Sequence, residues 1–148
     1  MSSLLGYSPL QIWKRRFLMK IGVFVRDETT SRVILGACRE LKVWGATFFD
    51  SPHVSQLPEL IAEELLLCDT AVVIMEIVNE ADYALLAALM DKSLMIGVIG
   101  GDAHQLRRVG SAESDYVRIS ENMEPASEEI SKFLTRCAQS LADFGSKA

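Results

Sequence analysis

The residues best placed to do chemistry in this sequence are polar or small residues that follow long apolar runs. Glu76 and Asn79 follow one such run, and Gly100 and Gly101 follow another. Runs of this kind are typical of strands buried on both faces of a parallel sheet, and such sheets bind ligands beyond the carboxyl ends of their strands. We therefore expect a ligand-binding region at that edge, formed by Asp27, Glu76, Asn79, Gly100 and Gly101.

Three carboxylates around the third expected strand and helix could take part in catalysis. Asp69 precedes that strand, and Glu80 and Asp82 follow it. A carboxylate can serve as a nucleophile or as a general acid or base. Acids at the start of a helix also complement its macrodipole without any substrate. Our main interpretation assigns no catalytic residue, and these three acids define the enzymatic alternative.

The remaining motifs predict neither a cofactor nor a metal. Gly100 and Gly101 belong to no GxGxxG or P-loop pattern, so we expect them to form a tight turn. The alternative is that they help to bind a small anion at the start of the next helix. Arg107 and Arg108 could grip a phosphate there. The three cysteines form no metal-binding pattern, and we expect buried free thiols in a reducing cytoplasm at Cys38, Cys68 and Cys137.

Length and charge limit the class of protein. The chain has 148 residues, 49% of them hydrophobic, which suits one compact domain. No apolar run is long enough to cross a bilayer. The net charge is −5, and no basic residue lies between Lys42 and Lys92. The resulting negative potential should repel phosphate backbones, so we expect neither nucleic-acid nor membrane binding.

The chain divides into an N-terminal extension, residues 1–18, and a domain over residues 19–148. Within the extension, Trp13 and Phe17 are spaced to share one face, which we expect to pack on the domain itself. Strands and helices alternate in the domain. The strands are expected at 21–25, 46–49, 70–75, 94–99 and 116–119, and the helices at 30–41, 55–67, 83–91, 103–109 and along an apolar stripe from Ile130 to Leu141.

This alternation predicts an α/β fold with a five-stranded parallel sheet between two layers of helices. The commonest arrangement at this size is the three-layer flavodoxin-like sandwich with strand order 2-1-3-4-5. Thr29 or Thr30 is the expected N-cap of the first helix in the domain.

Two segments resemble the receiver domains of response regulators. Residues 23–32 are similar to the first strand and acidic turn of a receiver, and residues 114–120 to its fifth strand. The resemblance implies a phosphate acceptor at Ile74 or Met75, which an apolar side chain cannot provide. It also puts an acidic pair at Arg26 and Asp27, where only one acid remains. The resemblance therefore implies a degenerate receiver that works by binding a protein partner.

A shorter stretch, residues 68–98, is similar to the nucleoside deoxyribosyltransferase superfamily. That resemblance implies a glutamate nucleophile early in the third helix, where this chain has Tyr83, with Glu80 and Asp82 as nearby carboxylates. The alternative function is therefore a nucleotide-binding protein or enzyme of that type.

In receivers the partner surface commonly includes the fourth helix, the fifth strand and the fifth helix. The resemblance implies a homodimer through this surface, which here holds Arg107, Arg108, Tyr116, Arg118 and the amphipathic final helix. Tyr116 would be the central aromatic anchor of the interface.

Overall fold

The computed structural model describes residues 19–41, 46–48, 58–90, 92, 94–110 and 116–147, and the predicted N-terminal extension lies outside this range. Strands and helices alternate along the described chain: β1 (Ile21–Phe24), α2 (Glu28–Glu40), β2 (Ala46–Phe48), α3 (Pro58–Leu67), β3 (Val72–Ile77), α4 (Glu80–Met90), β4 (Met95–Gly100), α5 (Ala103–Val109), β5 (Val117–Ser120) and α6 (Ser127–Lys147). The predicted α/β class with a parallel sheet is confirmed.

The strands lie in the order β2-β1-β3-β4-β5, and every neighbouring pair is parallel. β3 is central, with Val72 in register with Ile21 of β1 and Met95 of β4. All carboxyl ends therefore meet at one edge of the sheet. Within the described residues, no helix is both long and apolar enough to cross a membrane.

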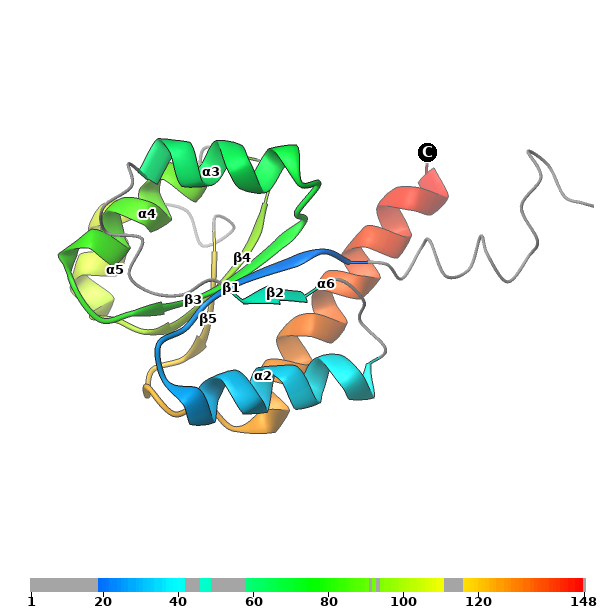
Figure 1. The fold of residues 1–148 in the computed structure, drawn as a ribbon, viewed down its shortest axis with the longest axis horizontal. Coiled ribbons are helices and arrows are strands. Elements are labelled where there is room, and N and C mark those ends of the chain that lie inside the picture. Colours follow the sequence, from blue (N-terminus) through cyan, green and yellow to red (C-terminus); the bar gives the residue numbers. More distant parts are fainter. Residues whose placement is uncertain are drawn as a thin grey trace, which may run out of the picture.

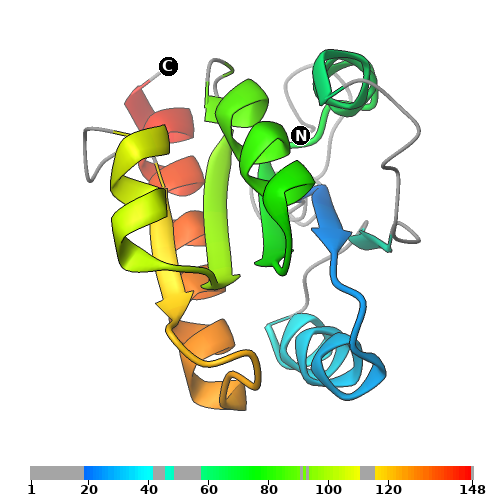
Figure 2. The same cartoon turned by 90° about the vertical axis from the view of Figure 1, so that its left-hand side faces the viewer.

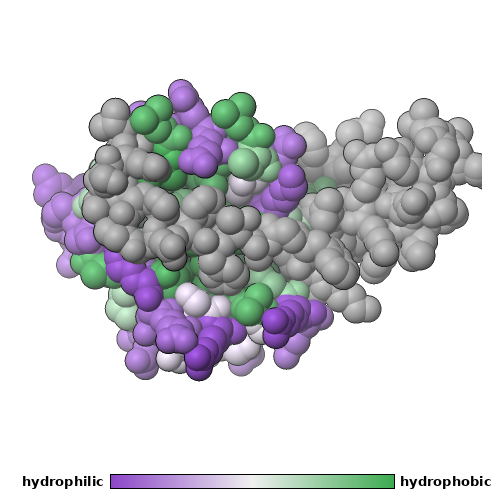
Figure 3. All heavy atoms as spheres, in the orientation of Figure 1, coloured by the Kyte–Doolittle hydropathy of each residue, from purple (hydrophilic) through white to green (hydrophobic). Residues whose placement is uncertain are grey.

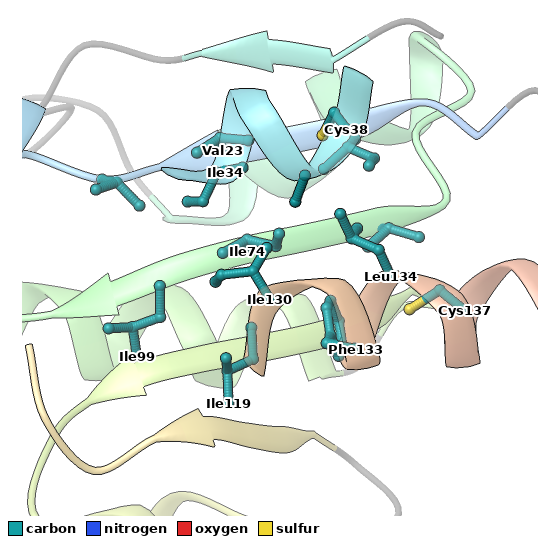
Figure 4. Packing of buried hydrophobic residues seen from close by; sticks show 14 of the residues in the cluster. Val23, Ile34, Cys38, Ile74, Ile99, Ile119, Ile130, Phe133, Leu134 and Cys137 are labelled. Carbon is teal, nitrogen blue, oxygen red and sulfur yellow. The ribbon is translucent and has the colours of Figure 1, made fainter. Parts of the chain in front are cut away.

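Helices cover both faces of the sheet, α2 and α6 on one side and α3, α4 and α5 on the other (Figures 1 and 2). Side chains alternate along β3, so Ile74 packs against α2 and α6 while Met75 packs on the opposite face. Figure 4 shows the first of these two cores, in which α2 and α6 contribute Ile34, Cys38, Ile130, Phe133, Leu134 and Cys137.

The ends of several elements differ from the prediction because local hydrogen bonds determine them. α2 begins at Glu28, since Asp27 is its N-cap and accepts a hydrogen bond from the backbone N of Thr30 at 3.0 Å. Thr29 and Thr30 lie inside the helix instead. β3 begins two residues later than expected, because Thr70 belongs to the turn after α3 and its backbone N donates to the carbonyl oxygen of Leu65.

The prediction of three buried cysteines is wrong for one of them. Cys38 and Cys137 are buried, but Cys68 is exposed because it lies in the turn that ends α3. Burial raises the pKa of the Cys38 thiol and raises that of Cys137 to about 12. Cys68 is therefore the accessible thiol among the three.

Two glycines give a matched test of the packing on the sheet. A Cβ at Gly97 in β4 would lie 2.5 Å from Cδ1 of Ile119 and 2.8 Å from the ring of Phe133, whereas one at Gly36 in α2 would meet nothing within 4 Å. We expect Gly97→Ala to lower the free energy of unfolding by about 1–3 kcal/mol through overpacking. Gly36→Ala should raise it by about 0.5–1 kcal/mol through helix propensity. Urea denaturation measures both, and a Gly97→Ala variant as stable as the parent would contradict the packing described.

Candidate functional site

The buried polar side chains of the described residues gather at the carboxyl edge of the sheet. They are Thr30, Glu76, Asp82 and Ser120, which come from the first turn of α2, the end of β3, the first turn of α4 and the end of β5. Burying polar groups costs free energy unless they are hydrogen-bonded. This edge is therefore where the fold departs from an apolar interior, and it is the candidate site.

An ion pair between Arg26 and Asp82 crosses this edge. Nη1 and Nη2 of Arg26 lie 2.9 and 3.0 Å from the two carboxylate oxygens of Asp82, which is bidentate geometry. The two side chains are 28% and 11% exposed, so water screens the pair only in part. The hydrogen bonds to Asp82 raise the pKa of Arg26 above its ordinary value, and the charges of Asp82 and Glu76 add to this effect against the opposing effect of burial.

The same carboxylate also organises the start of α4. Oδ2 of Asp82 accepts hydrogen bonds from the backbone N of Val78 at 2.8 Å and of Asn79 at 3.1 Å. The Asn79 side chain in turn accepts from the backbone N of Asp82 at 3.3 Å. This reciprocal arrangement is a capping box. It explains why α4 starts at Glu80, three residues before the predicted start. It also means that two candidate site residues, Asn79 and Asp82, form hydrogen bonds within the protein.

Glu76 lies beside this pair and is only 3% exposed. Its Oε1 accepts a hydrogen bond from the backbone N of Arg26 at 3.1 Å, while its Oε2 is buried without a hydrogen-bond partner among the described residues. A buried carboxylate needs a compensating charge nearby. Arg26 therefore contacts both acids. Its guanidinium pairs with Asp82, and its backbone N–H donates a hydrogen bond to Glu76.

Asp27 and Thr30 complete the side of the site nearest α2. Besides the capping hydrogen bond, Oδ2 of Asp27 lies 2.9 Å from the hydroxyl of Thr30, which is buried. Asp27 is exposed, but its carboxylate is held by the helix that it caps.

The glycine pair after β4 forms a closed turn. Gly100 and Gly101 have φ angles of 78° and 82°, which side chains rarely adopt. Arg118 of β5 donates to their carbonyl oxygens, from Nε at 3.2 Å and from Nη2 at 2.5 Å. A Cβ at Gly100 would collide with Sδ of Met123. These contacts fill the space next to the backbone, as the tight-turn interpretation expects.

Tyr83 fixes the residue that follows this turn. Its hydroxyl oxygen accepts a hydrogen bond from the backbone N of Asp102 at 2.8 Å. Asp102 is the N-cap of α5 and accepts from the backbone N of His104 and Gln105. The start of α5 is thus tied to α4.

The three acids of the enzymatic alternative do not come together. Asp69 lies in the turn after α3, at the amino end of β3, whereas Glu80 and Asp82 follow the carboxyl end. The six residues of β3 separate them by about 20 Å. Asp69 has a φ of 59° and its backbone N donates to the carbonyl oxygen of Leu66 at 3.0 Å, the geometry of a helix C-terminal turn. Glu80 is exposed.

The predicted interface residues have different environments. Arg107 and Arg108 are exposed in the last turn of α5, more than a turn beyond the glycine loop. Tyr116 is partly buried and packs against the core beneath α3, α4 and α5. Arg118 is held by the glycine loop, with a longer contact of 3.8 Å to Glu121.

Two features of this site were not anticipated as functional. In the sequence Arg26 is only a departure from the acidic pair of receivers, and a cation between an apolar strand and Asp27 is the available signal. Ser120 carried no signal at all. Among the described residues, no group of three or more His, Cys, Asp or Glu side chains could hold a metal ion.

Comparison of the chain with models of known protein families finds no match, and comparison with curated protein sequences finds none either.

Removing the Arg26 side chain should destabilise the fold. Arg26→Met leaves Asp82 and Glu76 without their cation, and we expect a loss of about 3 kcal/mol in the free energy of unfolding. Arg26→Lys keeps the charge without the bidentate geometry and should lose less. The control is Arg32→Met, whose ion pair with Glu28 is exposed and should be worth less than about 0.5 kcal/mol. Equal losses for Arg26→Met and Arg32→Met in urea denaturation would refute the role of Arg26.

Proposed function

We propose that this chain is a degenerate, receiver-like regulatory module of flavodoxin-like architecture that acts by binding a protein partner and not by phosphotransfer. Its unpaired cysteines suit a cytoplasmic location. The observation that carries the proposal is the guanidinium of Arg26, which pairs with Asp82 at the carboxyl edge of the sheet. A working receiver needs acids at this edge to hold magnesium.

The charges at the edge support this proposal. Magnesium is held by several oxygen ligands with little steric freedom. In this chain the guanidinium of Arg26 pairs with Asp82 and also interacts with the charge of Glu76, so Arg26 would repel a second cation. Receivers have an acid at each of two adjacent positions in this loop. In this chain Arg26 replaces the first of the two acids. Binding of a metal is thus replaced by a permanent ion pair.

The acceptor positions lead to the same conclusion. Ile74 and Met75 are fully buried and have no group that can attack phosphorus. Glu76 is the next residue. Its carboxylate is buried and accepts a hydrogen bond from the backbone N of Arg26, just after β1. We infer that Glu76 supplies a fixed negative charge at the end of β3, in place of one that phosphorylation would create.

The nucleoside deoxyribosyltransferase-like alternative gains no support from the contacts of its candidate residues. Both carboxylate oxygens of Asp82 accept hydrogen bonds from Arg26, and the Tyr83 hydroxyl is bound to Asp102. A glycosyl nucleophile must reach its substrate, and of the two carboxylates at the start of α4 only Glu80 is exposed. The hydrogen bonds at the carboxyl edge favour a fixed structure over a catalytic site that must bind and release a substrate.

We expect incubation with acetyl phosphate and magnesium to leave the mass of the protein unchanged, because no exposed carboxylate lies at the acceptor position. Intact-protein mass spectrometry measures this directly. A parallel sample of a receiver with an intact acidic pair controls for the activity of the phosphate donor. An added phosphoryl group on an aspartate or glutamate of this chain would refute the proposal.

We propose that self-association rests on charge more than on Tyr116, because that ring is partly buried in its own domain. Arg107 and Arg108 are the exposed cations of the predicted interface, and exposed acids lie at the carboxyl edge, among them Glu80, Asp102, Glu121 and Glu124. In a twofold dimer the cations of each subunit would face acids of the other, which fixes orientation.

Reversing these charges should therefore weaken the dimer. We expect the double variant Arg107→Glu, Arg108→Glu to shift light scattering toward the monomer at low salt, and high salt to do the same to the parent. Arg32→Glu, on the exposed surface of α2 and outside this interface, is the matched control and should have no effect. A parent that is monomeric at low salt, or a double variant that dimerises as well as the parent, would exclude this interface.

A further inference from the structure

α3 exposes apolar side chains on the surface away from the core. Leu60, Leu66 and Leu67 are 55%, 40% and 85% exposed, and they make up half of the large apolar side chains exposed among the described residues. The opposite side of α3 packs on the sheet through Ile61 and Leu65. Figure 3 shows hydrophobic atoms interspersed with hydrophilic ones along the edge where Figure 1 places α3. A helix that is apolar on both sides is typically covered on both.

The exposed side of α3 has a definite order of side chains. Leu60 and Leu67 are seven residues apart and lie on the same side of the helix, with Glu63 and Glu64 between them. Both glutamates are exposed. The outer face of α3 therefore has an apolar group at each end and two negative charges in the middle. Its complement is a segment with apolar ends and a basic centre.

The chain contains such a segment immediately before β1. In Trp13-Lys14-Arg15-Arg16-Phe17, two aromatic residues flank three cations. We propose that residues 13–17 pack on the outer face of α3 in the same chain, with the aromatic rings against Leu60 and Leu67 and the cations against Glu63 and Glu64.

The start of β1 is in the right place for this contact. The carbonyl oxygen of Lys20 accepts hydrogen bonds from the backbone N of Ala71 at 3.0 Å and of Val72 at 3.2 Å, just after the turn that ends α3. Only Leu18 separates Phe17 from the described strand region. Five extended residues reach up to about 17 Å, and the ten residues of α3 span about 15 Å. The segment can thus run from Leu67 to Leu60 without a longer linker.

Charge distinguishes this occupant from the other segment that adjoins α3. Residues 49–57 lead directly into α3 but contain no lysine or arginine and carry one acid, Asp50. They offer nothing that would neutralise Glu63 and Glu64. The same basic segment from a second copy would satisfy the chemistry equally, so the test must separate contact within one chain from contact between chains.

Trp13 provides a direct probe of the contact in the full-length chain. In a Trp44→Phe background it is the sole tryptophan. We expect its emission to be blue-shifted relative to the urea-unfolded protein and unchanged on hundredfold dilution. Leu67→Glu should move the emission to the unfolded position, because it adds charge where the ring would pack. Leu41→Glu, at an exposed leucine after α2 on the other face, is the control and should not.

Charge reversal provides a second, independent measurement. Glu63→Lys with Glu64→Lys should release Trp13, and adding Lys14→Glu, Arg15→Glu and Arg16→Glu to that variant should restore the blue shift. Circular dichroism checks that each variant folds. Emission that is solvent-exposed in the parent, or that ignores Leu67→Glu, would overturn the proposal. Loss of the blue shift on dilution would assign the contact to a second copy and would also overturn it.

The reactivity of Cys68 provides a third measurement of whether this surface of α3 is covered. It directly follows Leu67 and is the accessible thiol of the described residues. If residues 13–17 cover this end of α3, Trp13→Ala with Phe17→Ala should speed alkylation of Cys68 by maleimide several-fold. An unchanged rate would contradict the proposal.

None of these readouts depends on phosphorylation or dimerisation, so this proposal can fail while the proposed function stands.

Discussion

The carboxyl edge of the sheet depends on one guanidinium group. Arg26 is bound through its side chain to Asp82 and through its backbone to Glu76, so one residue compensates two buried or nearly buried acids. Without a cation, two carboxylates in this environment would repel each other and would lose hydration. The arrangement of the loops around the edge follows from keeping that cation in place.

Contacts extend from this pair across three loops. Asp82 caps the start of α4, Tyr83 in the next position binds the backbone of Asp102, and Arg118 holds the two carbonyl oxygens of the glycine turn. The contacts of Tyr83 and Arg118 join elements that are far apart in sequence, whereas the cap by Asp82 is local. A ligand that needed these backbone groups would have to displace protein hydrogen bonds, at a cost in affinity. The edge therefore favours a fixed shape that a partner can recognise over a site that binds and releases small molecules.

The surfaces proposed for binding extend from the exposed acids of this edge to helices beyond it. α5 carries the exposed cations, and α3 carries the exposed leucines and glutamates. Both helices belong to the layer opposite α2 and α6 (Figure 2). The opposite face, shown in Figure 4, is dominated by the apolar contacts of α6 with the sheet. Both faces of the sheet carry a buried core, and the helices on one of them also present the exposed cations, leucines and glutamates.

Local patterns in the sequence are sufficient to predict the α/β class and the approximate positions of the described strands and helices. Strands buried on both faces must be continuously apolar, and an amphipathic helix must repeat its apolar residues, so both patterns are local and can be recognised in the chain. The ends of the elements were less predictable. Asp27 instead of a threonine caps α2, because the choice depends on which side chain reaches the free backbone N–H groups.

The way in which the candidate residues combine depends on contacts between distant segments of the chain. Arg26 and Asp82 are 56 residues apart, and no local pattern indicates that their side chains meet. The sequence placed Asp69 with Glu80 and Asp82 because they flank the same strand, but that strand holds them at opposite ends of the sheet. Local patterns report burial and periodicity, whereas ion pairs, buried carboxylates and closed turns arise from the packing of distant segments.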